Sequence, residues 1–442
     1  MAGATPRRAL LGAGLAVVLA ALAFAPSAAS AETDWLELRA LNMAHQGGED
    51  EAPSNAIYAY ERALRLGSDM LEVDIHTTAD GEIVVIHDAT VDRTTDGSGR
   101  VYDMTLKEIQ ALDAGYNLVP GEGTESDRPA SDYPFRGVRT GERKPPPAFG
   151  PDDFRIPSLP EVMDAYPDVP INIEIKGAAD EDRASYIRNA EILAAYLNEL
   201  GRTEGIIVVS FSDEAVARFH QLAPQIDLAP AIAGVAGYKL AGVPPPEGTV
   251  AFQVPIAFEG LTVTDEAFID QAHSDGYAVH NWTINDPDEM NMLLDWGTDG
   301  IMTAEPIRLE QVLCGRGEPR PERPASFPGR HCNPKASIAC EVEPTAAERK
   351  GRRLKVTLAR RDEFAGRCAG KLAAKAIGRK ARKKTTFDFG DVPPGEEGGV
   401  AEQVVKVELN RKLRRSIRHK GKVQLMTHPY TAFVAKQRVG VT

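Results

Sequence analysis

The stretch that decides the fold is residues 70–88, MLEVDIHTTADGEIVVIHD, in which two apolar runs flank a turn. Apolar and polar side chains alternate along the first run, which is typical of a β-strand. Its polar face carries Glu72, Asp74 and His76 instead of the neutral or Lys side chains of an ordinary half-buried strand. The pattern therefore predicts a strand at 70–76 that presents ligand-type groups.

Asp80-Gly81 is a turn signal between the two runs. The connection is too short for the helix that joins two parallel strands. We therefore expect the chain to fold back on itself and to bring His87 close to Asp74. His76 shares a face with Asp74 but lies beyond it, so a place at the rim is expected for it rather than a catalytic one.

Two other segments carry similar groups. His45 follows a short apolar run near the N-terminus, and the alternating segment 171–176 contains Glu174 and Lys176. Each of these groups stands at the C-terminal end of a strand-like segment. That end is where α/β barrels hold their catalytic residues.

Strand-like and helix-like segments alternate from residue 35 to residue 314, which predicts a TIM-type (β/α)8 barrel. Strands are expected near 41–45, 70–76, 83–87, 171–176, 206–211, 226–232, 277–282 and 299–303. Helices are expected at 54–66, 105–112, 158–165, 183–200, 213–222, 265–274 and 287–295.

Residues 118–155 interrupt this rhythm with seven prolines and several glycines. The segment is too long to be an ordinary connection. It leaves the barrel on the side of His87, so it is either a lid that selects substrate or a disordered surface insertion. The sequence does not separate these two interpretations.

The two ends of the chain differ from the barrel. Residues 1–31 have paired arginines, an apolar run and a small-residue cleavage site, which predicts a signal peptide and a secreted or cell-envelope protein. Residues 315–335 are rich in Pro, Arg and Gly and are predicted as a linker. Residues 336–442 alternate again in short runs, which predicts a small, sandwich-like all-β domain.

Charge divides at the same boundary. Residues 316–442 hold 30 Lys and Arg against 13 Asp and Glu. The whole chain has 51 Lys and Arg against 64 Asp and Glu, so residues 1–315 have 21 against 51. A domain with a net charge of +17 attracts polyanions such as an anionic envelope polymer or a membrane surface. The alternative is that it docks on the acidic barrel. No interleaved aromatic residues indicate specific nucleic-acid binding.

All four cysteines lie at or after this boundary. An even number in an exported protein predicts two disulfides. Three pairings exist, of which we favour the nearest-neighbour one, Cys314–Cys332 and Cys340–Cys368. A zinc site is not expected, because no Cys-x-x-Cys spacing occurs.

Together these motifs resemble the glycerophosphodiester phosphodiesterase family, a phospholipase C-like barrel whose pattern reads HRGG, E-x-D, DG…HD, E-x-K, WTVN and G-x-D-G-I-x-T. The resemblance covers about 270 residues and leaves out the basic C-terminal domain. The matching segments are His45–Gly48, Glu72–Asp74, Asp80–Asp88, Glu174–Lys176, Asn281–Asn285 and Gly297–Thr303.

The residues fit phosphodiester chemistry. Glu72, Asp74 and Glu174 offer only hard oxygen ligands, which favours Ca²⁺ or Mg²⁺ over zinc. His45 and His87 suit proton transfer near neutral pH. The resemblance implies the same roles, three metal ligands and a general acid and base, and it does not say which histidine is which.

Three substrate-binding residues come from the resemblance alone. Lys176 is expected near the phosphate, and Trp282 matches an aromatic residue near the substrate. Gln46 stands where the family pattern has arginine, so it can donate a hydrogen bond but not a charge-assisted bidentate pair. Ser54 stands where the family has an acid, and Thr303-Ala304 replaces a usual Thr-Asp.

The sequence thus predicts a secreted, metal-dependent phosphodiesterase that hydrolyses glycerophosphodiesters to an alcohol and glycerol phosphate. A lysophospholipase D-like enzyme on the same barrel is an alternative, favoured if residues 118–155 present an apolar face, although this segment is mostly polar. A non-catalytic protein that binds envelope polyanions is a third interpretation.

Overall fold

The computed structural model describes most of the barrel and parts of the C-terminal domain. The signal peptide predicted at 1–31 lies outside the described residues. The described ranges are 33–146, 149–179, 181–327, 331–332, 342–350, 352–360, 369–375, 382–388, 401–410, 413–414, 422–429 and 436–440.

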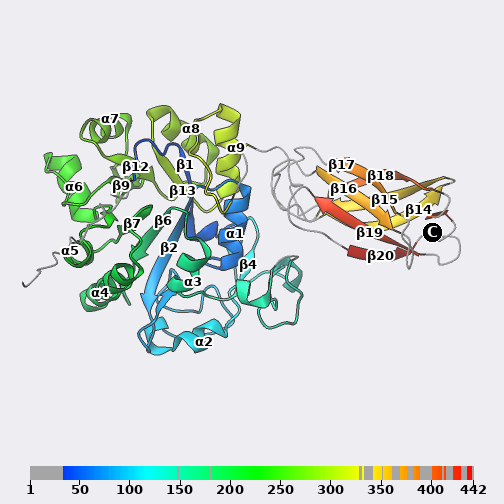
Figure 1. The fold of residues 1–442 in the computed structure, drawn as a ribbon, viewed down its shortest axis with the longest axis horizontal. Coiled ribbons are helices and arrows are strands. Elements are labelled where there is room, and N and C mark those ends of the chain that lie inside the picture. Colours follow the sequence, from blue (N-terminus) through cyan, green and yellow to red (C-terminus); the bar gives the residue numbers. More distant parts are fainter. Residues whose placement is uncertain are drawn as a thin grey trace, which may run out of the picture. The chain divides into compact units, whose positions relative to one another are not determined.

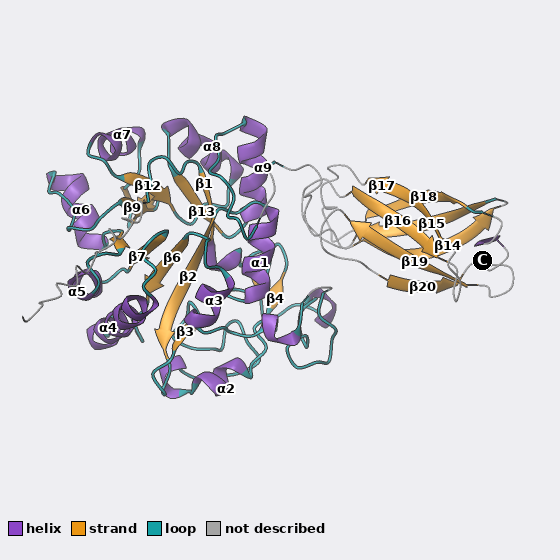
Figure 2. Cartoon of the chain, in the orientation of Figure 1, coloured by secondary structure: helices purple, strands orange, loops and turns teal. Residues whose placement is uncertain are grey.

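Eight parallel strands form a nearly closed barrel that helices surround (Figures 1 and 2), which confirms the predicted (β/α)8 architecture. The neighbour order is β8-β7-β6-β2-β1-β13-β12-β9, and a parallel bridge between Leu228 and Thr249 joins its two ends. The strands are β1 Leu41–Ala44, β2 Met70–Thr77, β6 Ile171–Ile175, β7 Ile206–Val209, β8 Asp227–Leu228, β9 Ala251–Val254, β12 Ala278–Asn281 and β13 Gly300–Thr303.

Helices follow these strands along the chain, and several begin with a side-chain cap. Ser158, for example, accepts a hydrogen bond from the backbone N–H of Glu161, whose carboxylate accepts one from the backbone N–H of Ser158. Among the described residues, none of the helices combines the length and apolar character needed to span a bilayer. The helices are α1 Ile57–Leu66, α2 Leu106–Gln110, α3 Leu159–Ala165, α4 Arg183–Leu200, α5 Asp213–Leu222, α6 Ile232–Ala241, α7 Glu266–Ser274, α8 Pro287–Trp296 and α9 Pro306–Arg316.

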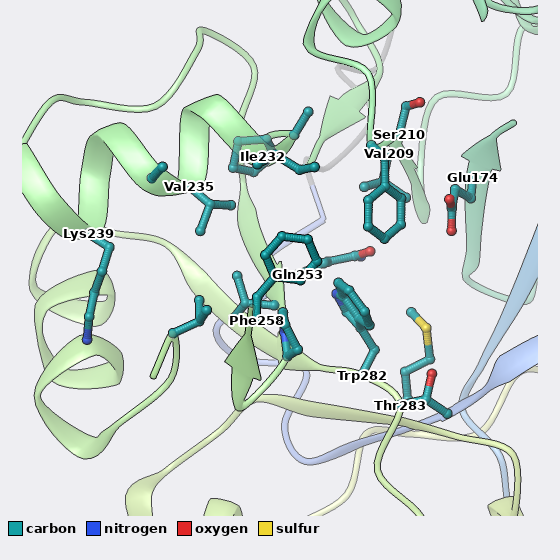
Figure 3. Close-up of a pocket in the computed structure, with 18 of the residues that line it drawn as sticks. Glu174, Val209, Ser210, Ile232, Val235, Lys239, Gln253, Phe258, Trp282 and Thr283 are labelled. Carbon is teal, nitrogen blue, oxygen red and sulfur yellow. The ribbon is translucent and has the colours of Figure 1, made fainter. Parts of the chain in front are cut away.

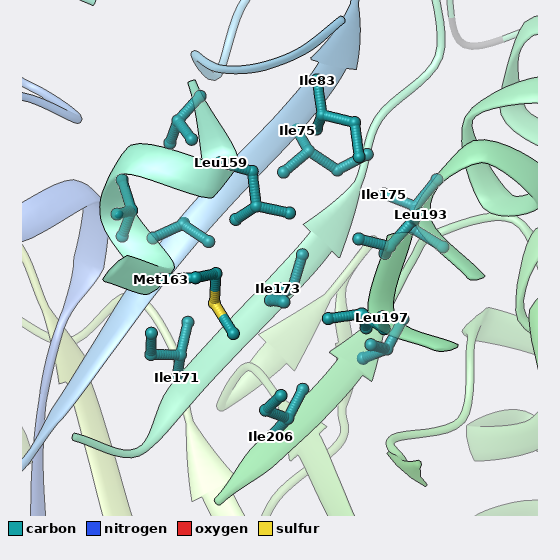
Figure 4. Close-up of a cluster of buried hydrophobic side chains, with 14 of the residues drawn as sticks. Ile75, Ile83, Leu159, Met163, Ile171, Ile173, Ile175, Leu193, Leu197 and Ile206 are labelled. Atoms are coloured by element: carbon teal, nitrogen blue, oxygen red, sulfur yellow. The ribbon is translucent and has the colours of Figure 1, made fainter. Parts of the chain in front are cut away.

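The alternating pattern of β2 and β6 sorts their side chains as expected. Ile75 of β2 and Ile173 of β6 are buried on the outer face of the sheet, against α3 and α4 (Figure 4). The residues between them face the barrel interior. Because the strands are parallel and in register, Asp74 pairs with Glu174. The apolar outer face thereby fixes where the acidic groups meet.

The predicted fold-back after β2 is confirmed. β3 (Ile83–Val85) pairs antiparallel with β2, and the N–H of Ile86 donates to the carbonyl of Asp74 at 3.0 Å. The barrel strand Ala251–Val254 was missing from the expected set, which had eight strands only because it included 83–87. Helices α6 and α9 were also missed. The run at 251–254 is four residues long and is interrupted by Gln253, so its signal is weak.

The insertion at 118–155 is ordered where it is described. Three phenylalanines pack around Tyr58 of α1, with ring centroids of Phe135, Phe149 and Phe154 at 5.1, 4.9 and 4.6 Å. The insertion therefore has a hydrophobic anchor of its own on the barrel. It contains the short strands β4 (Leu118–Val119) and β5 (Gly123–Thr124) and two 3-10 turns, Ala130–Asp132 and Pro151–Phe154.

Part of the segment predicted as a linker lies against the barrel. Arg320 is buried and pairs with Asp69, which precedes β2, and with Glu310 of α9. Phe327 packs on Tyr166, with ring centroids 6.0 Å apart. These contacts hold the chain after α9 at the end of the barrel where the strands begin.

The disulfide Cys314–Cys332 is present, with its Cα atoms 5.2 Å apart, and this confirms one of the two predicted pairs. It closes a loop over 18 positions of sequence. The predicted pair Cys340–Cys368 lies outside the described residues.

In its described residues the C-terminal domain has two antiparallel sheets, which confirms a small all-β domain. One sheet has the order β14-β15-β18 and the other β17-β16-β19-β20, and β14 contacts β19. Apolar side chains of β15 and β16, such as Val356 and Leu372, are fully buried. The strands are β14 Val342–Lys350, β15 Arg353–Arg360, β16 Ala369–Lys375, β17 Arg382–Asp388, β18 Ala401–Glu408, β19 Lys422–Pro429 and β20 Lys436–Gly440.

His280 of β12 gives the barrel a pH-dependent stability. Neither of its ring nitrogens has a hydrogen-bond partner within the described structure, and burial lowers its pKa from 6.5 to about 4. Between these two values the unfolded chain binds a proton that the folded protein does not, so stability falls as the pH falls.

As the pH falls from about 7 to about 5, we expect the free energy of unfolding of His280→Leu to rise by about 2 kcal/mol relative to that of the wild type. Urea unfolding at both pH values measures this difference. His76, whose pKa burial also lowers to about 4, is present in both proteins and cancels. Parallel pH profiles for the two proteins would contradict the prediction.

Candidate active site

Three carboxylates meet at the carboxyl ends of two neighbouring strands. Glu72 and Asp74 come from β2 and Glu174 from β6, and one oxygen of each lies within 4.8 Å of the others. Glu72 and Asp74 are almost fully buried. The three predicted ligand residues are thus brought together.

Three like charges so close together disfavour one another. Burial, and then the charge of Asp74, raise the pKa of Glu72 well above its ordinary value. Burial also acts against ionised Asp74, but Lys176 and His87 outweigh it and lower the Asp74 pKa to about 2. The Nζ of Lys176 lies 3.1 Å from Asp74 Oδ1 and 2.7 Å from Glu174 Oε1.

The donor set fits a hard divalent cation. Glu72 Oε1 is buried without a hydrogen-bond partner among the described residues. Such an atom is costly to bury unless something neutralises it. Three carboxylates are the ligands that Ca²⁺ or Mg²⁺ takes. The three carboxylates therefore form a candidate site for a divalent cation.

A tight turn after β1 positions His45 beside these acids. Gln46 has a left-handed backbone (φ 50°), which is costly for a residue with a side chain. Its N–H donates to Glu72 Oε2 at 2.7 Å, and its carbonyl accepts from the N–H of Asn55 at 2.8 Å. At Gly47 (φ 81°) a Cβ atom would lie 2.8 Å from the Cβ of Ala59, so only glycine fits there.

Glu49 contacts His45 directly. Its Oε1 lies 2.5 Å from His45 Nδ1, and both side chains are largely buried. Burial by itself lowers the pKa of His45, but the charges of Glu49 and Glu72 and the hydrogen bond from His45 outweigh it and raise the pKa to about 10. His45 is therefore protonated near neutral pH in this arrangement.

His87 has a different carboxylate partner. Its Nδ1 lies 2.8 Å from Asp88 Oδ1, and Arg93 donates two hydrogen bonds to Asp88 at 2.6 and 2.9 Å. The carboxylate of Asp88 is thus shared between a guanidinium and an imidazole. The Nε2 of His76 points to the carbonyl of His87 at 3.1 Å, so His76 supports the hairpin.

Gln46 and Ser54 pair with each other. Gln46 is buried, and its Oε1 accepts a hydrogen bond from Ser54 Oγ at 2.6 Å. Next to Ser54, Asn55 donates to Asp74 Oδ2 at 3.1 Å and accepts from the hydroxyl of Tyr60 at 2.6 Å. Asn55 therefore holds one of the three acids, a role that the sequence did not indicate.

A cavity of about 310 Å³ opens beside the acids (Figure 3). His45, His87, Glu174 and Lys176 line one end of it. Trp282 also lines it and packs edge-on against Phe211, with ring centroids 5.5 Å apart. No described residue of the insertion at 118–155 contributes to the lining.

The predicted residues are distributed in three ways. Those that reach the cavity are His45, His87, Glu174, Lys176 and Trp282. Glu72 and Asp74 lie behind them in the acidic cluster, and Gln46 contributes its backbone N–H to Glu72 and its side chain to Ser54. The sequence reasoning missed Glu49, because its contact with His45 depends on the turn at Gln46.

A parallel barrel that gathers two histidines, a lysine and three acids at the carboxyl ends of its strands is the frame of a barrel enzyme. The glycerophosphoryl diester phosphodiesterase family model matches residues 45–308, more than half of the chain. The chain therefore belongs to this family, as the sequence motifs predicted. The predicted enzyme class, a phosphoric diester hydrolase, is that of the family.

Curated relatives agree with this assignment, and a solved structure shows the same fold. A glycerophosphodiester phosphodiesterase of Caldanaerobacter subterraneus is 29% identical over 284 residues, 62% of this chain and 98% of the relative. A rat protein named lysophospholipase D GDPD1 is 26% identical, covering 62% of this chain and 85% of its own length. The structure of a glycerophosphoryl diester phosphodiesterase from Silicibacter pomeroyi covers 65% of this chain and 99% of its own, at 20% identity and a TM-score of 0.51.

Replacing Glu49 tests the cause of the His45 shift. We expect Glu49→Gln to lower the pKa of His45 by about 1 to 2 pH units. The substitution removes one negative charge beside His45 but leaves those of Glu72 and Asp74 in place. NMR titration of the His45 ring measures this. Glu61→Gln, in a surface pair with Arg65, is the matched control. An unchanged titration in Glu49→Gln would show that the contact does not set the protonation of His45.

Proposed function

We propose that this chain is an exported, divalent-cation-dependent phosphodiesterase that hydrolyses glycerophosphodiesters to glycerol phosphate and an alcohol. Family membership supports the reaction class, and several curated relatives are named glycerophosphodiester phosphodiesterase. One observation carries the proposal. Six ionisable side chains converge at one end of the barrel: His45, Glu72, Asp74, His87, Glu174 and Lys176.

In this proposal His45 is the proton donor. The Glu49 carboxylate holds its Nδ1, and the surrounding negative charges favour the imidazolium form. His87 is then the acceptor. The oxygen of water forms a new bond to phosphorus while His87 takes its proton, the bond from phosphorus to the leaving alkoxide breaks, and His45 protonates that alkoxide.

Glu72, Asp74 and Glu174 are the proposed cation ligands. The oxygen-only set favours Ca²⁺ or Mg²⁺. When bound, the cation supplies a Lewis acid for a non-bridging phosphate oxygen. Lys176, within 3.1 Å of Asp74 Oδ1, adds positive charge beside the place where the phosphate binds.

Turnover of glycerophosphocholine tests the function. We expect release of choline with Ca²⁺ or Mg²⁺, loss of it with excess chelator, and a drop of about 10²- to 10⁴-fold in kcat for His45→Ala and for His87→Ala. His220→Ala, on α5 and outside the cavity lining, is the control. No turnover by folded, cation-loaded wild type would favour the non-catalytic binding protein.

Cation binding has a readout apart from turnover. The cation should raise the melting temperature of the wild type and not that of Glu72→Gln, because the binding free energy adds to stability. Equal shifts in both proteins would place the cation elsewhere.

We further propose that the protein acts outside the cytoplasm and that its basic domain holds it on an anionic envelope polymer or membrane surface. The signal-like residues 1–31 and the 30 Lys and Arg against 13 Asp and Glu over 316–442 support this. Attraction of this kind is screened by salt.

Fractionation of expressing cells tests both parts. The protein should be found in the envelope fraction without residues 1–31, as mass spectrometry of its N-terminus reports, and high salt should release it. A truncation after Cys332 should be secreted but not retained. Retention that is insensitive to salt, or an intact N-terminus, would contradict the proposal.

A further inference from the structure

The cavity beside the acids has two unlike parts. Its polar end is formed by the two histidines, Glu174 and Lys176, and Glu174 is the one acidic residue among those that line it in the described structure. From there the cavity runs between Trp282 and Phe258 toward Ile232 and Val235 (Figure 3). A glycerophosphodiester without an acyl chain has no long apolar group that would contact the second part.

Two elements missed or unremarked in the sequence build the apolar part. One is α6, IAGVAGYKLA, which has no acidic residue and a single cation, Lys239. The other is the hairpin of β10 (Ala257–Phe258) and β11 (Leu261–Thr262). Lys239 Nζ lies 2.8 Å from Asp265 Oδ2, so its charge is already paired.

The mouth of the cavity exposes large apolar side chains. The exposed fractions are 46% for Ile232, 73% for Leu240, 38% for Phe258 and 63% for Leu261, and all four line the cavity. Single exposed apolar residues are ordinary, but a group around one opening marks a site for an apolar ligand. When a ligand covers these side chains, each Å² of apolar surface that is removed from water stabilises the complex by about 25 cal/mol.

We propose that this cavity binds the single acyl chain of a lysophospholipid, whose glycerophosphodiester group then lies at the catalytic end. The proposal rests on the proposed function and names its substrate class. It is supported by the lining of the cavity, because the proposed catalytic groups and the apolar side chains line one and the same cavity. At about 310 Å³ the cavity is at the lower end of the range for ligand pockets, which suits one chain better than two.

The proposal changes which element decides between small and lipid substrates. The sequence pointed to residues 118–155, whose polar composition disfavours lipid. Within the described residues that segment packs on Tyr58 and does not line the cavity. Selection belongs to α6 and the β10–β11 hairpin instead. On a lysophospholipid, water attacks phosphorus, the bond to the headgroup oxygen breaks, and that oxygen is protonated, giving an acyl-glycerol phosphate and the headgroup alcohol.

Chain-length dependence tests the proposal. Full-length protein with cation is given glycerophosphocholine and a series of lysophosphatidylcholines of increasing chain length, each below its critical micelle concentration. We expect kcat/KM to rise with chain length until the cavity is full. Calorimetry with the acyl-glycerol phosphate product should give a negative heat-capacity change, the mark of apolar burial.

Charged substitutions at the mouth locate the effect. In the double variant Leu240→Glu/Leu261→Glu, the ratio of kcat/KM for a long-chain lysophospholipid to that for glycerophosphocholine should fall at least about tenfold, which corresponds to about 1.4 kcal/mol. Both residues are exposed, so folding is not at risk. Leu200→Glu, exposed on α4 and outside the cavity, is the control and should keep the ratio.

The outcomes separate the two proposals. Turnover of glycerophosphocholine with no gain from an acyl chain, or a ratio that the double variant leaves unchanged, overturns the acyl site and leaves the phosphodiesterase standing. No turnover of any phosphodiester overturns the proposed function, while calorimetry with the product still decides whether the acyl chain binds. Equal loss in the Leu200 variant would overturn the assignment to this cavity.

Discussion

The mutual repulsion of three buried carboxylates is the constraint around which the catalytic end of this barrel is arranged. Glu72 and Asp74 are separated by one residue on β2, and the parallel register places Glu174 beside Asp74. Such a cluster opposes folding unless positive charge or hydrogen-bond donors surround it. Each element at this end of the barrel brings one such group.

The contributions come from distant parts of the chain. Lys176 directly follows β6, and Asn55 lies two residues before α1. The turn after β1 brings His45 and the backbone N–H of Gln46. The hairpin adds His87, which also lowers the pKa of Asp74. A bound divalent cation would relieve the repulsion that remains, which supports the proposed cation site.

Patterns that are local in sequence were sufficient to predict half of this site. The period of two on β2 and β6 fixed which side chains face inward, and the short turn at Asp80-Gly81 fixed the hairpin that returns His87. These features depend only on neighbours along one or two strands. The family resemblance then related His45 and Trp282 to the same end of the barrel.

What the sequence did not predict depends on tertiary contacts. Glu49 matters because the turn at Gln46 directs it back to His45, and nothing in its spacing specifies that backbone conformation. The strand 251–254 is too short to be recognised without the barrel that it closes. α6 was overlooked because its small apolar residues lack a polar face, and that composition is itself what shapes the cavity mouth.

The contacts after α9 have a consequence for how the two folded parts are connected. Arg320 and the disulfide Cys314–Cys332 fix that stretch beside Asp69, at the end of the barrel where β2 begins. The catalytic groups lie at the opposite end of the same strands. Cys332, the last described residue of this stretch, therefore lies on the face of the barrel away from the cavity. In the proposed anchoring, the barrel is therefore attached at a point that does not compete with substrate for the opening of the cavity.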